Sequence, residues 1–183
     1  MKLEVLYEMH PVRITQDWGV RDPFYEQFGF KEHNGTDYAL GDRAELRAGI
    51  PCEVTKIGYQ HTGAGHYICL LSLEQYDFED GKRAHVELTY MHLDHTIAEV
   101  GQKLATGDLF AIGDNTGAST GPHTHIAPKR VKKTAGGYYE IDKNDAKNTF
   151  DIEKYRSGGF AVQAKQISLL STVLSLYKRL RGV

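Results

Sequence analysis

The feature that most constrains the fold is a series of short runs of β-forming residues, each ended by a turn signal. The runs are rich in Val, Ile, Leu, Tyr and Thr, and the pair Asp80-Gly81 between two of them favours a hairpin. Several short strands joined by turns are typical of an antiparallel β fold. We therefore expect a mainly β domain, with strands within residues 46–58, 66–73, 84–91, 108–112 and 123–127.

The C-terminal residues follow a different pattern, with apolar side chains at helical spacing. After Gly158 and Gly159, this spacing predicts an amphipathic helix over residues 160–181. We favour packing of this helix against its own domain; contact with a partner, an oligomer or a membrane surface is the alternative. We expect one domain over residues 1–157 and a C-terminal helix over residues 158–183.

Composition limits the class of protein. The chain has 183 residues, which is enough for one compact domain and short for two. Its 22 Lys and Arg residues nearly balance its 24 Asp and Glu residues, so the net charge is -2. A chain this close to neutral lacks the positive field that holds DNA or RNA, and we expect no nucleic-acid partner.

The N-terminal residues and the cysteines bear on location. Glu4, Glu8 and His10 interrupt the apolar stretch that a signal peptide needs, and no run is long enough to cross a bilayer. We therefore expect no signal peptide and no transmembrane segment. Cys52 and Cys69 are too few for a disulfide framework. One bridge between them is open, and we favour two buried thiols because both lie in apolar runs.

Three of the nine histidines are spaced for joint chemistry. His123 and His125 are two residues apart, so in a strand both side chains point to the same face. In extended backbone the spacing of His33 and Asp37 also places both on one face, and Gly35 between them permits close backbone approach. One imidazole and one carboxylate from this segment, with one later histidine, make a three-ligand zinc set with an open fourth position, as in catalytic zinc sites.

These residues belong to motifs that resemble the lysostaphin/LytM-type zinc endopeptidases, peptidase family M23, which cleave peptidoglycan peptides. The resemblance spans residues 14–155 and includes a two-glycine turn segment over residues 100–113. The motifs follow the family's order: Ile14-Thr-Gln-Asp-Trp-Gly-Val-Arg21, His33-Asn-Gly-Thr-Asp37, Tyr90-Met-His92-Leu93, Gly117-Ala-Ser-Thr-Gly-Pro-His-Thr-His125 and Phe150-Asp-Ile-Glu-Lys-Tyr155.

The resemblance implies a fold, a metal and a reaction. It implies an antiparallel β-sheet with a central groove that holds one zinc ion per chain. It implies that His33, Asp37 and His125 are the zinc ligands and that His92 and His123 are the catalytic histidines. The implied activity is hydrolysis of peptide bonds in peptidoglycan stem or cross-bridge peptides by a metal-activated water. Which of His92 and His123 is the general base, and which bond is cut, both stay open.

Four positions depart from the family pattern without removing a ligand or a catalytic histidine. Ile126-Ala127 replaces the usual Phe and acidic residue after the last histidine, Thr36 replaces a usual Ile or Val, and Ile152 replaces a Pro. The polar segment of residues 129–147 is expected to be a variable loop beside the groove, with solvated cations in residues 129–133.

The remaining residues are given structural roles. We expect ordinary structural positions for the other five histidines and a place in the core or the groove wall for Trp18. Those histidines are His10, His61, His66, His85 and His95.

Two hypotheses about the whole protein follow. In the first, it is a phage or prophage lysin, released through a holin or carried on the virion, and the helix of residues 160–181 docks it on a particle or partner. The second, from another class, is a non-hydrolytic, zinc-stabilised module that binds cell wall or assembles in a phage tail.

Overall fold

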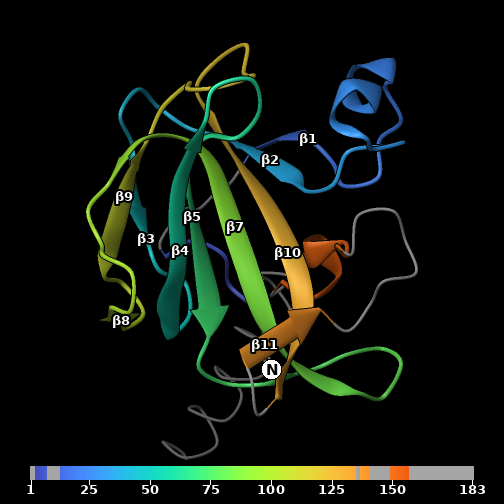
Figure 1. Cartoon of the computed structure of the whole chain (residues 1–183), viewed down its shortest axis with the longest axis vertical. Coiled ribbons are helices and arrows are strands. Elements are labelled where there is room, and N and C mark those ends of the chain that lie inside the picture. The colour runs from blue at the N-terminus through green and yellow to red at the C-terminus, as the bar shows by residue number, and fades with distance from the viewer. Residues whose placement is uncertain (1–2, 8–12, 135–136, 141–148, 157–183) are drawn as a thin grey trace, which may run out of the picture.

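The computed structural model describes residues 3–7, 13–134, 137–140 and 149–156. These residues form a single antiparallel sheet system with two short 3-10 helices (Figure 1). The elements in chain order are β1 Ile14–Gln16, η1 Pro23–Phe28, β2 Thr36–Ala39, β3 Glu45–Arg47, β4 Cys52–Gln60, β5 Gly65–Ser72, β6 Tyr76–Asp77, β7 Arg83–Thr96, β8 Lys103–Leu104, β9 Leu109–Gly113, β10 His123–Thr134, β11 Gly137–Glu140 and η2 Ile152–Lys154.

The sheet places segments that are distant in sequence next to one another. Its main order is β1-β2-β10-β7-β5-β4-β8, and every pairing is antiparallel. In Figure 1 the long strands β10, β7, β5 and β4 run side by side through the centre of the molecule. The mainly β, antiparallel fold class predicted from the sequence is therefore confirmed.

The two faces of the central strands differ, because successive side chains of a strand point to opposite sides. On β7, Val86, Leu88 and Tyr90 are fully buried in the apolar core, together with Leu46 of β3 and Phe110 of β9. The intervening residues of β7, including Glu87, Thr89 and Met91, face the opposite side and line a groove. The core thus supports one face of the sheet and leaves the other for the site.

Residues 129–134 correct one prediction. They were expected to begin a variable loop, yet they continue β10, and residues 137–140 return as β11. Val131 is buried, and the guanidinium of Arg130 lies 4.8 Å from the centre of the Phe78 ring and pairs with Asp80 at 2.9 Å. These long-range contacts hold the charged segment in the sheet, although its local sequence favours a loop.

Other sequence predictions are settled in part. The Asp80-Gly81 turn joins β6 to β7, and Gly81 has a φ of 74°. Both cysteines are free and buried, as predicted. Among the described residues, no helix is both long enough and apolar enough to cross a membrane. The predicted helix of residues 160–181 lies outside the described residues, so it and the proposed boundary at residue 157 stay predictions.

Candidate metal centre and groove

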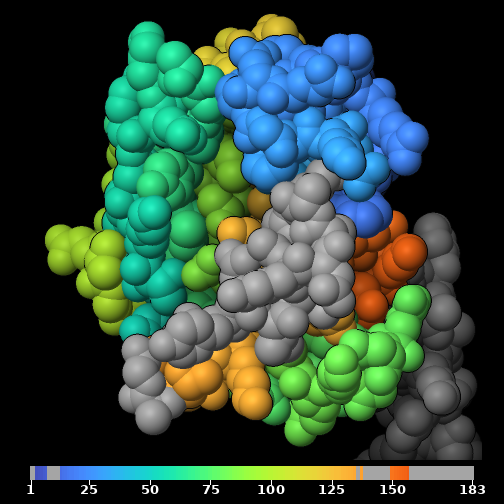
Figure 2. All heavy atoms as spheres, turned by 45° about the vertical axis from the view of Figure 1, so that its right-hand side comes forward, coloured from blue at the N-terminus to red at the C-terminus, as the bar shows by residue number. Residues whose placement is uncertain are grey.

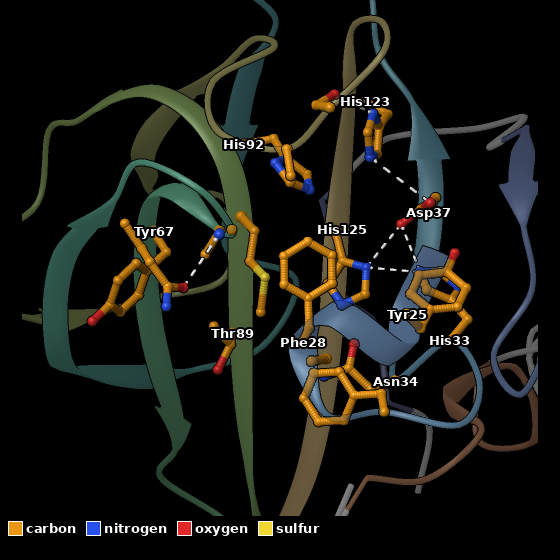
Figure 3. Close-up of a pocket in the computed structure, with 18 of the residues that line it drawn as sticks. Tyr25, Phe28, His33, Asn34, Asp37, Tyr67, Thr89, His92, His123 and His125 are labelled. Atoms are coloured by element: carbon orange, nitrogen blue, oxygen red, sulfur yellow. Dashed lines mark hydrogen bonds and ion pairs between the residues drawn. The ribbon is translucent and has the colours of Figure 1, made fainter. Parts of the chain in front are cut away.

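Pairing of β2 with β10 brings the first group of polar side chains together. Asp37 of β2 lies directly opposite His125 of β10, and His33 lies just before β2. All three residues are buried. Figure 3 shows their side chains converging on the Asp37 carboxylate, with His123 approaching the same carboxylate from the other side.

The three converging side chains present their ligand atoms at short range. His33 Nε2 lies 2.9 Å from His125 Nδ1 and 3.2 Å from Asp37 Oδ1, and His125 Nδ1 lies 2.9 Å from the same Oδ1. A tetrahedral zinc ion with bonds of about 2.0–2.1 Å holds its ligand atoms about 3.3 Å apart. Two imidazole nitrogens and one carboxylate oxygen at this spacing fit zinc.

The charge states of these groups also suit a cation. Burial opposes ionisation of Asp37, but hydrogen bonds from His125 and His33 hold the pKa of its carboxyl well below the usual value. Burial lowers the pKa of His125, which favours its neutral form. His33 Nδ1 lies 2.9 Å from the carbonyl oxygen of Asp17. With the proton on Nδ1 and donated to this carbonyl, Nε2 would turn a lone pair toward a metal ion in place of its hydrogen bond to Asp37.

Gly35 gives the metal centre a testable steric requirement. A Cβ on Gly35 would lie 2.5 Å from His125 Nε2 and 2.5 Å from the Ile126 carbonyl oxygen, whereas a Cβ on Gly41 would meet nothing within 4 Å. Gly35→Ala is therefore expected to displace His125 and to reduce bound zinc by at least tenfold. Metal analysis of chelator-free protein checks this, with Gly41→Ala as the matched control. Equal zinc content in the two variants would contradict the packing.

Two further histidines face the metal centre from the groove. The ring centres of His92 on β7 and His123 on β10 are 4.7 Å apart, and His123 Nε2 lies 3.8 Å from Asp37 Oδ2. His92 Nδ1 lies 2.8 Å from the Thr116 carbonyl oxygen, and His123 Nδ1 lies 2.8 Å from that of Gly121. If each Nδ1–H donates to its carbonyl, each Nε2 keeps a lone pair for proton transfer.

The backbone of His92 is unusual. Its φ is 63°, in the left-handed region that side chains other than glycine rarely adopt. The pairing of β5 with β7 shifts register between residues 66 and 68, and that of β7 with β9 shifts between 93 and 95. Strain of this kind persists where the surrounding structure imposes it, often at functional sites. Burial also lowers the pKa of His92 to about 4, so its imidazole is neutral near pH 7.

Thr116 holds the irregular part of β7 in place. Its hydroxyl donates to the Leu93 carbonyl at 2.6 Å and accepts from the His66 amide at 3.0 Å. Its own carbonyl is the partner of His92 Nδ1. Gly65 makes this approach feasible, because a Cβ there would lie 2.3 Å from the Thr116 hydroxyl oxygen. Thr116 thus replaces hydrogen bonds that the distorted strand pairing does not supply.

The five residues lie in a groove of about 1040 Å³. Figure 2 shows the hollow between the teal residues of the β4–β5 hairpin and the blue residues around η1. In Figure 3, Tyr67 stands on one side of the floor, and Phe28 and Tyr25 stand on the other. The Tyr25 ring also stacks on His33, with ring centres 5.1 Å apart and a 24° angle between the planes.

The five residues that the motifs assigned to one site lie close together in the structure, and the walls around them were not predicted. The short helix η1 that forms the aromatic wall could have been predicted, since Asp22 accepts from the Phe24 amide as an N-cap residue and Pro23 starts the helix.

Trp18 is half-buried and donates from Nε1 to Thr149 Oγ1 at 3.0 Å. Four histidines with assigned structural roles, His61, His66, His85 and His95, do not line the groove, and His10 lies outside the described residues.

A buried His-Asp-His group on an antiparallel sheet, with two more histidines beside it in an open groove, is the arrangement of a metallopeptidase. The model of peptidase family M23 matches residues 31–136, and this chain belongs to that family. The resemblance stated from the sequence motifs is therefore confirmed.

Relatives agree with this membership. An uncharacterized metalloprotease of Haemophilus influenzae is 33% identical over 95 residues, which are 52% of this chain and 18% of that protein. The peptidoglycan DD-endopeptidase ShyA of Vibrio cholerae is 30% identical over 98 residues, 51% of this chain and 19% of that protein. The matched residues thus span about a fifth of these curated relatives.

A solved structure supports the fold. The catalytic domain of the antimicrobial peptidase lysostaphin from Staphylococcus simulans is similar, with a TM-score of 0.53 and 21% sequence identity. The similarity covers 70% of this chain and 88% of the lysostaphin domain.

Proposed function

We propose that this chain is a zinc metalloendopeptidase that hydrolyses peptide bonds in the stem or cross-bridge peptides of peptidoglycan. The observation that carries the proposal is the convergence of His33, Asp37 and His125 within 3.2 Å, with His92 and His123 beside them in the groove. Membership of peptidase family M23 and similarity to a peptidoglycan DD-endopeptidase support this substrate class.

The proposed metal ligands are His33 Nε2, Asp37 Oδ1 and His125 Nδ1. Zinc bound by three protein ligands supplies Lewis acidity, which lowers the pKa of water toward neutrality and polarises a peptide carbonyl. The His33 partner, the Asp17 carbonyl, fixes the orientation of that ring.

The proposed roles of His92 and His123 are proton transfer and stabilisation of negative charge. Both rings are oriented by carbonyl acceptors at Nδ1, so each Nε2 can accept a proton from water or, once protonated, donate one to the departing amine. Burial lowers the pKa of His92, so its imidazole is uncharged near pH 7 and its Nε2 is open to a proton.

Digestion of purified sacculi tests the function. Zinc-loaded protein is expected to release soluble fragments, and mass spectrometry of fragments from sacculi with different cross-links identifies the cleaved bond. If the protein pellets with sacculi of every cross-link type and releases no new amino groups, the alternative of a non-hydrolytic, zinc-stabilised wall-binding module replaces this proposal.

Thr116 offers a test of how His92 is positioned. Thr116→Val keeps the side-chain shape but removes the hydroxyl that bridges His66 and Leu93, so the hydrolysis rate kcat is expected to fall about tenfold with KM nearly unchanged. Thr116→Ser keeps the hydroxyl and should restore kcat. A change in KM alone, or equal kcat in the two variants, would show that Thr116 does not position His92.

A further inference from the structure

Beyond the histidines, the groove continues into a segment with charged side chains. Its lining includes Lys56 of β4, Glu87 of β7 and Lys129 of β10, none of which belongs to the proposed metal or proton-transfer group. This end of the groove therefore differs in chemistry from the aromatic wall around η1.

Sheet register places these side chains on the groove face. Along β10, residues 125, 127 and 129 lie opposite residues 91, 89 and 87 of β7. In the neighbouring pairs, Thr89 lies opposite Cys69 of β5, and Cys69 lies opposite Lys56 of β4. Directly paired residues share a face of the sheet. One continuous floor thus runs from His125, past small uncharged side chains, to the charged end.

The carboxylate and the ammonium at this end are held by different neighbours. Glu87 Oε2 lies 3.4 Å from the Thr55 hydroxyl. Lys56 Nζ lies 5.4 Å from the centre of the Tyr67 ring. The Tyr67 ring lies across β4 at Gly58, its paired residue. A Cβ on Gly58 would come within 2.5 Å of the ring, so the missing side chain leaves room for it. A cation and an anion therefore face one groove from two strands that flank β5.

Lys56 and Glu87 lie on either side of Cys69 in the floor of the groove. Burial raises the pKa of Cys69, and its hydrogen bond with Thr89 opposes this rise; Glu87 raises the pKa by a smaller amount, and Lys56 and Lys129 lower it. The register gives the same grouping, since Cys69 lies between Lys56 on β4 and Thr89 on β7, two residues along that strand from Glu87. Strands β4 and β7 are two inter-strand spacings apart, about 10 Å, so the long side chains of Lys56 and Glu87 can approach a small group from both sides.

We propose that Lys56 and Glu87 form a specificity subsite for a substrate side chain that ends in both a carboxylate and an ammonium, as that of a diamino diacid does. This inference rests on the proposed function, since it assigns the side chain of a residue two positions from the cleaved bond in a peptidoglycan peptide. Lys56 binds the carboxylate and Glu87 binds the ammonium. A side chain with an ammonium alone satisfies only half of the subsite.

The length of the groove floor agrees with this substrate. From His125 to Lys129, β10 advances four residues, about 13 Å at about 3.3 Å per residue. An extended substrate covers about 7 Å in two residues, so a side chain must span the remaining ~6 Å to place its end group at Glu87. The methylene chain of a diamino diacid, which ends on a carbon bearing an amine and a carboxylate, has this reach.

Kinetics on three synthetic stem peptides test the subsite. The first carries the free diamino diacid, the second has its side-chain carboxylate as a carboxamide, and the third has its side-chain amine acetylated. The wild-type kcat/KM is expected to favour the first peptide about tenfold over each of the others, in line with charged hydrogen bonds. In Lys56→Gln, the kcat/KM for the first peptide should approach that for the carboxamide peptide. In Glu87→Gln, it should approach that for the acetylated peptide. Lys103→Gln and Glu99→Gln, exposed and outside the groove, should keep the wild-type ratios.

The outcomes separate this inference from the proposed function. Equal cleavage of all three peptides by the wild type, or unchanged ratios in Lys56→Gln and Glu87→Gln, overturns the subsite and leaves the peptidase proposal standing. If zinc-loaded protein cleaves none of them and also releases no amino groups from sacculi of any cross-link type, the peptidase proposal fails. Calorimetric binding of the same peptides then decides the subsite alone, and equal affinities for the three overturn it.

Discussion

Replacing His92 by asparagine is expected to reduce peptide hydrolysis by roughly 10²–10⁴-fold, the usual contribution of a general acid or base. The same loss is expected for His123→Ala. Neither side chain is among the proposed metal ligands, so both variants should keep about one zinc ion per chain. Rates on purified sacculi and metal analysis of the same preparations check the two halves of this prediction.

Asparagine is chosen at position 92 because the backbone there has a φ of 63°, which asparagine tolerates better than most residues. His92→Gly should be more stable than His92→Ala by about 1 kcal/mol, since glycine removes the backbone strain. Denaturant unfolding measures this difference.

The control for the loss of hydrolysis is His95→Asn, which replaces an exposed histidine on the same strand and outside the groove. Hydrolysis by His92→Asn at the rate of this control would defeat the proposed role.

Loss of a proposed metal ligand is expected to have the second large effect. His125→Ala and Asp37→Asn should lower zinc content from about one ion per chain to less than about a tenth of an ion per chain. Each variant keeps only two of the three close ligands, because the first loses an imidazole nitrogen and the second replaces a carboxylate with a neutral amide. Zinc should also raise the unfolding temperature of the wild type, since it binds the folded state, and should not raise that of either variant.

Metal analysis and thermal unfolding with added zinc check this prediction. His61→Ala, which replaces an exposed histidine outside the groove, controls for nonspecific loss of imidazole. Wild-type zinc content in His125→Ala would remove this residue from the ligand set. Loss of zinc in His61→Ala as well would point to a metal site elsewhere.

Alternation along the strands explains why much of the fold and the site was predictable. His123 and His125 were expected to share a face, and both approach the Asp37 carboxylate, at 3.8 and 2.9 Å. The pairing of Asp37 with His125 is a long-range feature that residue spacing alone does not specify. The ordered family motifs supplied it, because they implied one site for segments far apart in the sequence.

Features that depend on tertiary contacts were not predictable locally. The left-handed backbone of His92 results from packing around Thr116 and the shifted pairing of β7, and nothing in the sequence Tyr-Met-His-Leu indicates it. The continuation of β10 beyond residue 128 depends on Arg130, which contacts Phe78 and Asp80 from another part of the chain. Local charge favoured a loop there, and the tertiary contacts outweighed it.

Zinc-dependent hydrolysis is tested by protein that is stripped of metal with a chelator and then titrated with zinc in the presence of a peptidoglycan peptide. Stripped protein is expected to release no amino groups, and activity should rise in proportion to zinc until about one ion is bound per chain. Protein that holds one zinc ion through His33, Asp37 and His125, yet releases no amino groups from peptidoglycan of any cross-link type, would contradict the proposed hydrolysis.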